Sequence, residues 1–193
     1  MNILFVYAHP NPKSFTASII NELVDKAKEK NHHTDIRDLY AINFNPVLSN
    51  SDFQTFHSGS IPADIKTEQD LISNADIIVM VYQLWWTQFP AMLKGYIDRV
   101  YSYGFAYQYG ANGLEGLLKG KKVFLVTNTG TPSEIYTQYD MHTAINKTSN
   151  SGIFEYCGME VLEHIYNGGV VISTDETRKA YIENAVQSFD AYL

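Results

Sequence analysis

Six consecutive apolar residues, Ile77 to Tyr82, are the feature of the sequence that most limits its fold. A strand with one solvent-exposed face alternates apolar and polar residues, and this run shows no such alternation. Strands buried on both faces have this composition because helices cover each side of a parallel sheet. The run is also far shorter than the roughly 20 residues of a membrane-spanning helix. We therefore predict a central strand of a parallel α/β sheet.

The remainder of the chain alternates strand-like runs with segments in which apolar residues recur every three or four positions. The predicted strands are 2–7, 34–39, 77–82, 122–127 and 161–166. The predicted helices are 14–30, 64–73, 90–101, 136–149 and 177–192. This order predicts an α/β fold in which residues 1–193 form a single domain, a doubly wound five-stranded parallel sheet with helices on both faces. Residues 40–60 have no sustained period, so we expect a long surface excursion there.

Charge and cysteine content exclude several classes of protein. Fourteen Lys and Arg residues stand against 21 Asp and Glu residues, and the formal net charge of −7 has the wrong sign for binding nucleic acid. Cys157 is the only cysteine, so an internal disulfide and a cysteine-based zinc site are excluded. The N-terminal run lacks a basic leader and a cleavage site, and no run is long enough to insert in a membrane. We therefore expect a cytoplasmic protein without a metal site.

The first loop after a predicted strand has features of an anion site. Ligands of doubly wound sheets bind beyond the carboxyl ends of the strands. There, His9, Lys13, Ser14 and Thr16 surround the start of a predicted helix, whose free amides and dipole favour a phosphate. No glycine occurs before Gly59, so this loop is neither a dinucleotide-binding turn nor a P-loop. An ordinary capped helix would have the same features.

Two later loops carry side chains suited to a planar ligand. The loop 83–90 contains both tryptophans of the chain, Trp85 and Trp86. Two tryptophans in a polar loop favour a flat hydrophobic wall for a ligand, or packing against a neighbouring helix or subunit. The loop 127–132 offers hydroxyls and amides to the polar edge of a ring.

Further aromatic and titratable side chains follow these loops. Tyr136 and His142 are separated by six residues, so both can face one pocket and move a proton there. An aromatic series at every second position favours a subunit interface or a pocket wall on an extended segment. Its members are Tyr101, Tyr103, Phe105, Tyr107 and Tyr109.

Together these loops resemble the NAD(P)H:quinone oxidoreductase family, the flavodoxin-like flavoproteins of DT-diaphorase type. The resemblance spans most of the chain, and its most specific part is the long block from the aromatic loop to Phe-Ala-Tyr. The matching segments are Tyr7-Ala8-His9-Pro10 with Ser14-Phe15, Leu84-Trp85-Trp86, Phe89-Pro90-Ala91-Met92-Leu93-Lys94-Gly95-Tyr96-Ile97-Asp98-Arg99-Val100, Gly104-Phe105-Ala106-Tyr107, and Thr129-Gly130 with Tyr136 and His142.

The resemblance implies that residues 1–193 form a flavodoxin-like, flavin-binding domain that holds FAD or FMN, with FAD slightly favoured. The implied phosphate contacts are His9, Ser14, Phe15 and Thr16. The implied contacts to the ring system are Gln83, Leu84, Trp85 and Trp86, and those to its pyrimidine edge are Asn128, Thr129, Gly130 and Thr131. Arg178 matches a contact to the adenosine half of FAD.

The resemblance also implies a catalytic pair and a homodimer with shared active sites. Tyr136 and His142 match residues beside the flavin that stabilise negative charge on the reduced ring and pass a proton, and Tyr136 is also a flavin contact. Tyr107 and Tyr109 match positions that reach the substrate pocket across the dimer seam.

The implied activity is two-electron reduction of a quinone or similar electrophile by NAD(P)H, in ping-pong turnover through flavin N5. Two alternatives stay open: a flavodoxin-type carrier of single electrons, and an ancillary subunit associated peripherally with a potassium-efflux system. The chain departs from the family at Thr131, where a second glycine is usual, and at Gln83 and Thr87, where larger relatives have proline and an aromatic residue. These departures change the shape over the flavin and therefore the choice of acceptor.

Overall fold

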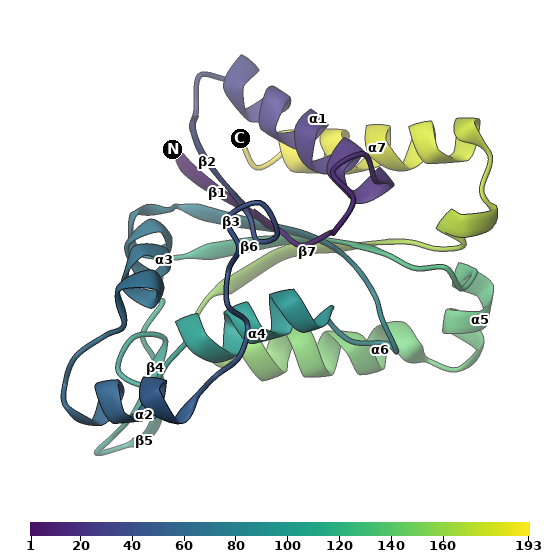
Figure 1. The fold of residues 1–193 in the computed structure, drawn as a ribbon. Coiled ribbons are helices and arrows are strands. Elements are labelled where there is room, and N and C mark those ends of the chain that lie inside the picture. Colours follow the sequence, from purple (N-terminus) through teal and green to yellow (C-terminus); the bar gives the residue numbers. More distant parts are fainter.

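The computed structural model describes residues 1–193 and is built around one parallel sheet (Figure 1). Its strands are β1 (Asn2–Tyr7), β2 (His33–Asp38), β3 (Ile77–Gln83), β6 (Lys122–Asn128) and β7 (Glu160–Asn167). They pair in the order β2-β1-β3-β6-β7, with every pairing parallel. The predicted α/β fold class and all five predicted strands are confirmed, and the apolar run at Ile77 forms the middle strand.

Helices cover both faces of the sheet, as the sequence predicts. Figure 1 shows α1 (Phe15–Glu29) and α7 (Asp175–Asp190) on one face, with α3 (Ala63–Asn74), α4 (Ala91–Val100) and α6 (Met141–Asn146) on the other. Successive side chains of a strand point to opposite faces, so each buried strand contributes to two cores. On β3, Val79 packs with the α1 and α7 side, whereas Met80 packs with the α3 and α4 side.

The excursion after β2 contains a helix that the periodicity of the sequence does not indicate. Helix α2 (Asn50–His57) begins at Ser49, whose hydroxyl accepts a hydrogen bond from the amide of Asp52. The Asp52 carboxylate in turn accepts one from the amide of Ser49, which completes a capping box. The expectation of an irregular excursion over 40–60 is therefore wrong for these eight residues.

The predicted helix 136–149 is broken into three pieces. Helix α5 (Ser133–Gln138) ends before Asp140, which adopts a left-handed conformation with φ of 52°. Helix α6 follows, and it continues into a π-helix, η1 (Lys147–Glu155). The single helix expected from the sequence is therefore wrong in its bounds and in its continuity.

The aromatic series does not lie on one extended segment. Only Tyr107 and Tyr109 are in a strand, β4 (Tyr107–Gly110), which pairs antiparallel with β5 (Gly113–Gly116). Tyr101 caps α4 and is 6% exposed, whereas Tyr109 is 66% exposed. A turn with Gly104 at φ of 83° separates them, so the expected aromatic face is wrong.

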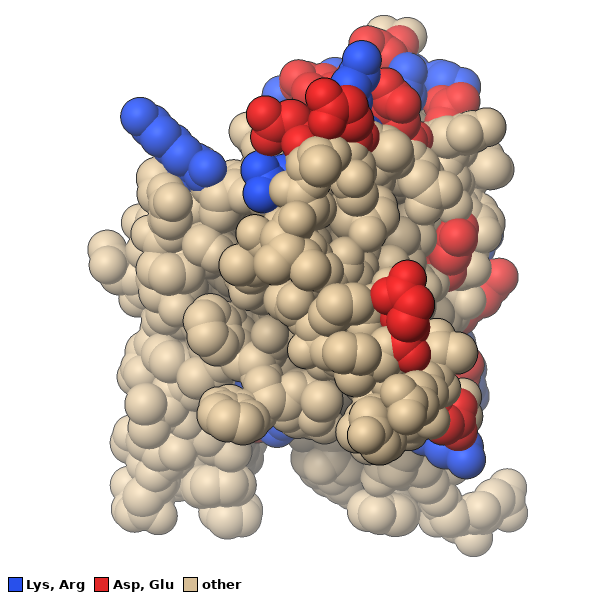
Figure 2. Space-filling view, turned by 90° about the vertical axis from the view of Figure 1, so that its right-hand side faces the viewer, with Lys and Arg blue, Asp and Glu red and all other residues tan.

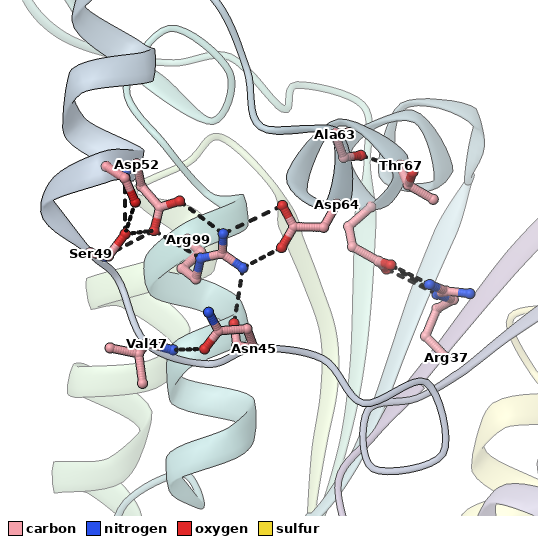
Figure 3. Close-up of polar contacts among 11 residues, drawn as sticks. Arg37, Asn45, Val47, Ser49, Asp52, Ala63, Asp64, Thr67 and Arg99 are labelled. Carbon is pink, nitrogen blue, oxygen red and sulfur yellow. Dashed lines mark hydrogen bonds and ion pairs between the residues drawn. The ribbon is translucent and has the colours of Figure 1, made fainter.

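Ion pairs attach the excursion to the helices beneath it (Figure 3). Arg99 of α4 is 3% exposed, and its Nε and Nη2 donate to the two carboxylate oxygens of Asp52 at 3.1 and 2.9 Å. Its Nη1 donates to the backbone oxygen of Asn45 at 2.9 Å and to Asp64 at the start of α3. One guanidinium thus joins α2, α3, α4 and the loop before α2, so the excursion is held in place by a single buried charge.

Candidate active site

The carboxyl ends of β1, β3 and β6 place three loops at one edge of the sheet, where the strand order reverses between β1 and β3. In the first loop, the Ser14 hydroxyl caps α1 by accepting from the amide of Ala17 at 3.1 Å. The amides of Phe15 and Thr16 have no acceptor in the chain. These two donors and the positive end of the helix dipole form an anion-binding terminus.

Two other predicted residues of the first loop are engaged within the chain. The ring Nδ1 of His9 accepts from the amide of Asn11 at 3.1 Å, which holds the turn before α1. Thr16 is 2% exposed, and its hydroxyl oxygen accepts from the Asn128 amide Nδ2 at 3.2 Å. Asn128 also accepts from Asn167 at 2.9 Å, so it joins the first loop to β7 and does not line the open cavity.

One cavity of about 400 Å³ collects the residues of the second and third loops. Its lining consists of Gln83, Leu84, Trp85, Trp86, Thr87, Thr129, Gly130, Thr131 and Tyr136. All of these except Thr87 are predicted site residues. Two loops from neighbouring strands and a residue of α5 thus form a single cleft of the size used for small-molecule ligands.

The tryptophan loop is held in a strained turn. The backbones of Trp85 and Gln88 exchange two hydrogen bonds of 3.0 Å, so only two residues connect them. These two, Trp86 and Thr87, have φ of 51° and 61°. Such turns favour Asn-Gly, because the left-handed region is costly for a side chain branched at Cβ. The turn leaves the Trp86 side chain 95% exposed at the cavity, free to cover a ligand.

The third loop is fixed by the end of β7. The amide of Thr129 donates to the Asn167 oxygen at 2.9 Å, and the amide of Val170 donates to the Thr129 oxygen at 2.9 Å. A Cβ added at Gly130 would lie 3.4 Å from Val171, an ordinary van der Waals contact with the segment after β7. The cavity wall formed by Thr129 to Thr131 is therefore anchored from two sides.

Tyr136 and His142 lie beside each other at the inner wall. Tyr136 is 6% exposed and lines the cavity, and no group of the chain accepts from its hydroxyl. The His142 ring packs against it, with 5.5 Å between ring centroids. The His142 Nε2 atom is buried without a hydrogen-bond partner. An unpaired buried nitrogen is costly, so a polar group of a bound molecule within its reach would be stabilised.

The edge that holds the cavity carries few charges. Figure 2 views the molecule from the side of the strand ends: charged side chains gather along the upper border and acidic ones also lie down the right side, whereas the left and central parts are largely uncharged. No group of three or more His, Cys, Asp or Glu side chains is placed to hold a metal ion. Burial raises the pKa of the Cys157 thiol to about 11, so this cysteine is a poor nucleophile at neutral pH.

Three predicted residues lie away from the cavity. The Arg178 guanidinium donates to Ser173 and to Asp175 at 3.1 Å each, at the start of α7. Tyr107 and Tyr109 lie on the β4–β5 hairpin, at the opposite end of the molecule from α5 in Figure 1. Within one chain, therefore, neither tyrosine reaches the cavity.

Sequence reasoning did not find the polar cluster behind the cavity. His164 and Tyr166 of β7 contact each other and lie next to His142. Both point to one face of a strand because they are two residues apart. A His-x-Tyr pair on one face of a predicted strand is the signal that could have found them.

The fold and the cavity define an oxidoreductase of flavodoxin-like architecture, and the comparisons with known proteins support this class. Residues 1–193 match a family described by its flavodoxin-like fold, and the chain belongs to that family. None of its helices has both the length and the apolarity needed to cross a membrane.

Relatives and solved structures agree with this assignment. An uncharacterized NAD(P)H oxidoreductase of Haemophilus influenzae is 41% identical over 194 residues, which cover 100% of this chain and 96% of the relative. The human ribosyldihydronicotinamide dehydrogenase (quinone) is 32% identical over 204 residues, covering 93% and 87%. The structure of NAD(P)H:quinone oxidoreductase from Methanothermobacter marburgensis superposes with a TM-score of 0.88 at 26% identity, covering 100% and 96%. The resemblance to this class of oxidoreductases is confirmed.

Proposed function

We propose that the protein is a flavin-dependent NAD(P)H oxidoreductase that reduces a quinone or a similar electrophile. The names of its relatives support this proposal. The observation that carries it is the cavity in which the second and third loops meet Tyr136, against whose ring His142 packs with a buried, unpaired Nε2.

The residues present fit a flavin in three respects. The unpaired amides of Phe15 and Thr16 suit a phosphate. Trp85 and Trp86 provide apolar surface for a flat ring, and the uncharged edge imposes little desolvation penalty on it. The buried Nε2 of His142 has no partner in the chain and would gain one from a polar ring edge.

The side chains at the cavity have different roles in this mechanism. A bound flavin would supply the hydride-transfer chemistry between NAD(P)H and the acceptor. Trp86 and Trp85 hold the aromatic substrate in the cleft and exclude water. The Tyr136 hydroxyl donates a hydrogen bond to negative charge that develops in the cavity. His142 holds a proton at Nε2 and delivers it to the acceptor.

We further propose a homodimer in which Tyr107 and Tyr109 of one copy complete the cavity of the other. Within one chain the hydroxyl of Tyr109 contacts only that of Tyr156, at 3.4 Å, and the side chain is largely exposed. Tyr103 and Phe53 are also exposed nearby on the same end of the molecule, a pattern that favours an interface over solvent. Light scattering at micromolar concentration should give about twice the 21.9 kDa chain mass.

FAD is the preferred cofactor in this proposal, with Arg178 as the contact to its adenosine half, and the cytoplasm is the proposed compartment. The test is to purify the protein, identify the extracted chromophore by mass, and reconstitute the apoprotein with FAD and with FMN. We expect a yellow protein that bleaches under NAD(P)H without oxygen and regains its colour when a quinone is added. A protein that binds neither flavin would contradict the proposal, and a stable one-electron intermediate during titration would favour an electron carrier.

The catalytic pair is tested with a matched control on the same helix turn. Tyr136→Phe removes the hydroxyl that faces the cavity, whereas Tyr139→Phe removes one at an exposed position three residues later. We expect turnover to fall roughly 10- to 1000-fold for Tyr136→Phe, as for loss of one charge-stabilising donor. Flavin affinity should stay unchanged, and Tyr139→Phe should behave as the parent protein. Equal turnover in both variants would remove the assigned role of Tyr136.

A further inference from the structure

Four rings contact one another in a series that runs from the cavity into the protein. Tyr136 lines the cavity, and His142 packs behind it. The ring of Tyr166 lies 4.5 Å from that of His142 between centroids, and the ring of His164 is stacked on Tyr166 at 4.2 Å with an interplanar angle of 22°. His142 is thus held between two tyrosine rings. No hydrogen bond of the chain fixes its Nε2 atom, so ring packing is what sets the direction of that atom.

The far end of the series is fixed by hydrogen bonds on both sides of His164. Its Nε2 lies 2.7 Å from the hydroxyl of Thr127, and its Nδ1 lies 2.9 Å from Oδ1 of Asn150. The Asn150 amide donates to Oδ1 of Asn146, which also accepts from the Tyr166 hydroxyl at 2.7 Å. An Nδ1–H tautomer of His164 satisfies every one of these contacts: it donates to Asn150 and accepts from Thr127.

A rare backbone geometry presents the asparagines to this network. Asn146 ends α6, and Asn150 belongs to the π-helix η1, the wider helix that replaces the α-helix expected there. Their side chains are hydrogen-bonded to each other at 3.2 Å. Short π-helical segments occur frequently at functional sites, because they displace a side chain that a regular helix would place elsewhere.

The network is electrically neutral at neutral pH. Burial, assisted by repulsion from His142, lowers the pKa of His164 to about 3, so its ring carries no charge. Burial also raises the pKa of Tyr166, so its hydroxyl keeps its proton. The titratable groups facing His142 are therefore Tyr136 of α5 and the pair Tyr166 and His164 of β7. Near neutral pH, Tyr166 and His164 neither gain nor lose a proton. They therefore hold the His142 ring without acting as a proton donor or acceptor themselves.

We propose that Tyr166 and His164 are positioning residues for His142, a ring wall anchored by Thr127, Asn146 and Asn150 that keeps His142 Nε2 directed at the molecule in the cavity. This inference rests on the proposed function, in which His142 supplies a proton. Neither Tyr166 nor His164 is among the residues that line the cavity, so the wall acts through His142.

Two substitutions of Tyr166 distinguish the contribution of its ring from that of its hydroxyl. Tyr166→Leu removes the ring against which His142 packs, whereas Tyr166→Phe keeps that ring and loses only the hydroxyl, with its bond to Asn146 and its 3.1 Å contact with His164 Nδ1. Val24→Ala, a buried truncation in α1 on the other face of the sheet, controls for a loss of stability alone. The set is measured first on the apoprotein and then on the protein loaded with flavin.

The first readout is the imidazole NMR signal of His142 in the apoprotein, assigned with His142→Asn. We expect one narrow signal in the parent protein, a broadened or split signal in Tyr166→Leu because the ring occupies several rotamers, and a largely restored single signal in Tyr166→Phe. The His164 signal should show the Nδ1–H tautomer and stay constant between pH 5 and 8, as its pKa of about 3 requires. This readout needs neither cofactor nor turnover.

The second readout is kinetic. In Tyr166→Leu we expect kcat to fall at least about 10-fold, toward the roughly 100-fold that a misplacement of about 1 Å can cause. The KM for NAD(P)H and the Kd for flavin should change less than about two-fold, and the pH profile of kcat should change shape. Tyr166→Phe should recover most of the lost kcat, and Val24→Ala should keep the parent profile.

Two outcomes would overturn the inference. One is a His142 signal that is the same in Tyr166→Leu and in the parent apoprotein. The other is a Tyr166→Leu enzyme that loses stability as Val24→Ala does and keeps kcat and its pH profile. A failure of the proposed function gives a different result: no flavin binds to any variant, while the His142 signal still responds to Tyr166→Leu.

Discussion

Replacing Arg99 with methionine should be among the most destabilising single changes in this chain. The substitution removes the guanidinium that joins Asp52, Asp64 and the oxygen of Asn45 (Figure 3), and methionine fills much of the same volume without a charge. The Asp52 carboxylate then stays buried without its cation. Asp64 is half exposed and can be hydrated, so most of the effect comes from Asp52.

The expected loss of unfolding free energy follows from these contacts. Removing one partner of a buried ion pair costs about 3–5 kcal/mol. Asp52 retains hydrogen bonds from the amide and the hydroxyl of Ser49, which places the loss near about 3 kcal/mol. At this chain length such a loss lowers Tm by roughly 6–12 °C. A total stability of about 5–15 kcal/mol leaves the variant folded and measurable.

The assay is urea unfolding followed by circular dichroism, with a double variant and a surface control. Arg99→Met with Asp52→Asn should recover about 1.5 kcal/mol or more relative to the sum of the single changes, because no buried charge is left unpaired. Lys94→Met breaks an exposed pair with Asp98 on the same helix and should cost less than about 1 kcal/mol.

The effect of Arg99→Met should also depend on pH. Arg99 is the main cause that lowers the folded-state pKa of Asp52 below its ordinary 3.8. A lowered carboxylate pKa contributes stability above the unfolded-state pKa and loses it as pH falls through the folded-state value. The difference between parent and variant should therefore be full at pH 7 and shrink below about pH 4. A loss under about 1 kcal/mol at pH 7, or no recovery in the double variant, would refute the assignment of a buried charge pair.

Two further predictions concern the strained turn at Thr87 and the buried ring of His164 behind the cavity. Thr87→Gly should raise the free energy of unfolding by about 0.5–1 kcal/mol, because relief of left-handed strain exceeds the added chain entropy. Gln88→Gly, without a positive φ, should lower it, and urea midpoints that rank the two the other way would contradict the strained turn. The folded-state pKa of His164 lies below its ordinary 6.5, at about 3, so only the unfolded chain takes up that proton as pH falls between these values. Stability should then fall by up to about 1.4 kcal/mol per pH unit in this window, and His164→Asn should flatten the slope; an unchanged slope in the variant would contradict the burial of a neutral ring.

The sheet could be predicted from the sequence because its determinants are local. Each strand is a short apolar run, and each covering helix repeats its apolar residues at helical spacing, so adjacent residues carry the information. Helix α2 was missed for the opposite reason. Its apolar pattern is weak, and it is held by a capping box together with an ion pair to Arg99, which lies 47 residues from Asp52 in the sequence. The Ser49–Asp52 spacing is the one local signal that could have indicated its start.

The predicted helix 136–149 is interrupted at Asp140, whose φ is 52°, and it ends as a π-helix. Asn146 and Asn150 bond to side chains of β7, and a π-helix accommodates those bonds where a regular α-helix was expected. No property of residues 136–149 taken alone contains that information. The cavity, by contrast, was predictable in its loops, because the rule that ligands bind at the carboxyl ends of strands needs only the order of elements.

The distribution of charge links these observations to the proposed chemistry. The buried ion pairs lie among β2, α2, α3 and α4, and the cavity lining contains no Lys, Arg, Asp or Glu side chain. A negative charge that develops in such a cleft meets little screening from neighbouring ions, so each correctly placed donor has a large effect. Tyr136 and His142 are the donors that the chain offers there, and the neutral network around His164 adds no competing charge. Protonation of His164 would place a cation behind His142, and burial, which lowers the pKa of His164 to about 3, prevents this at neutral pH.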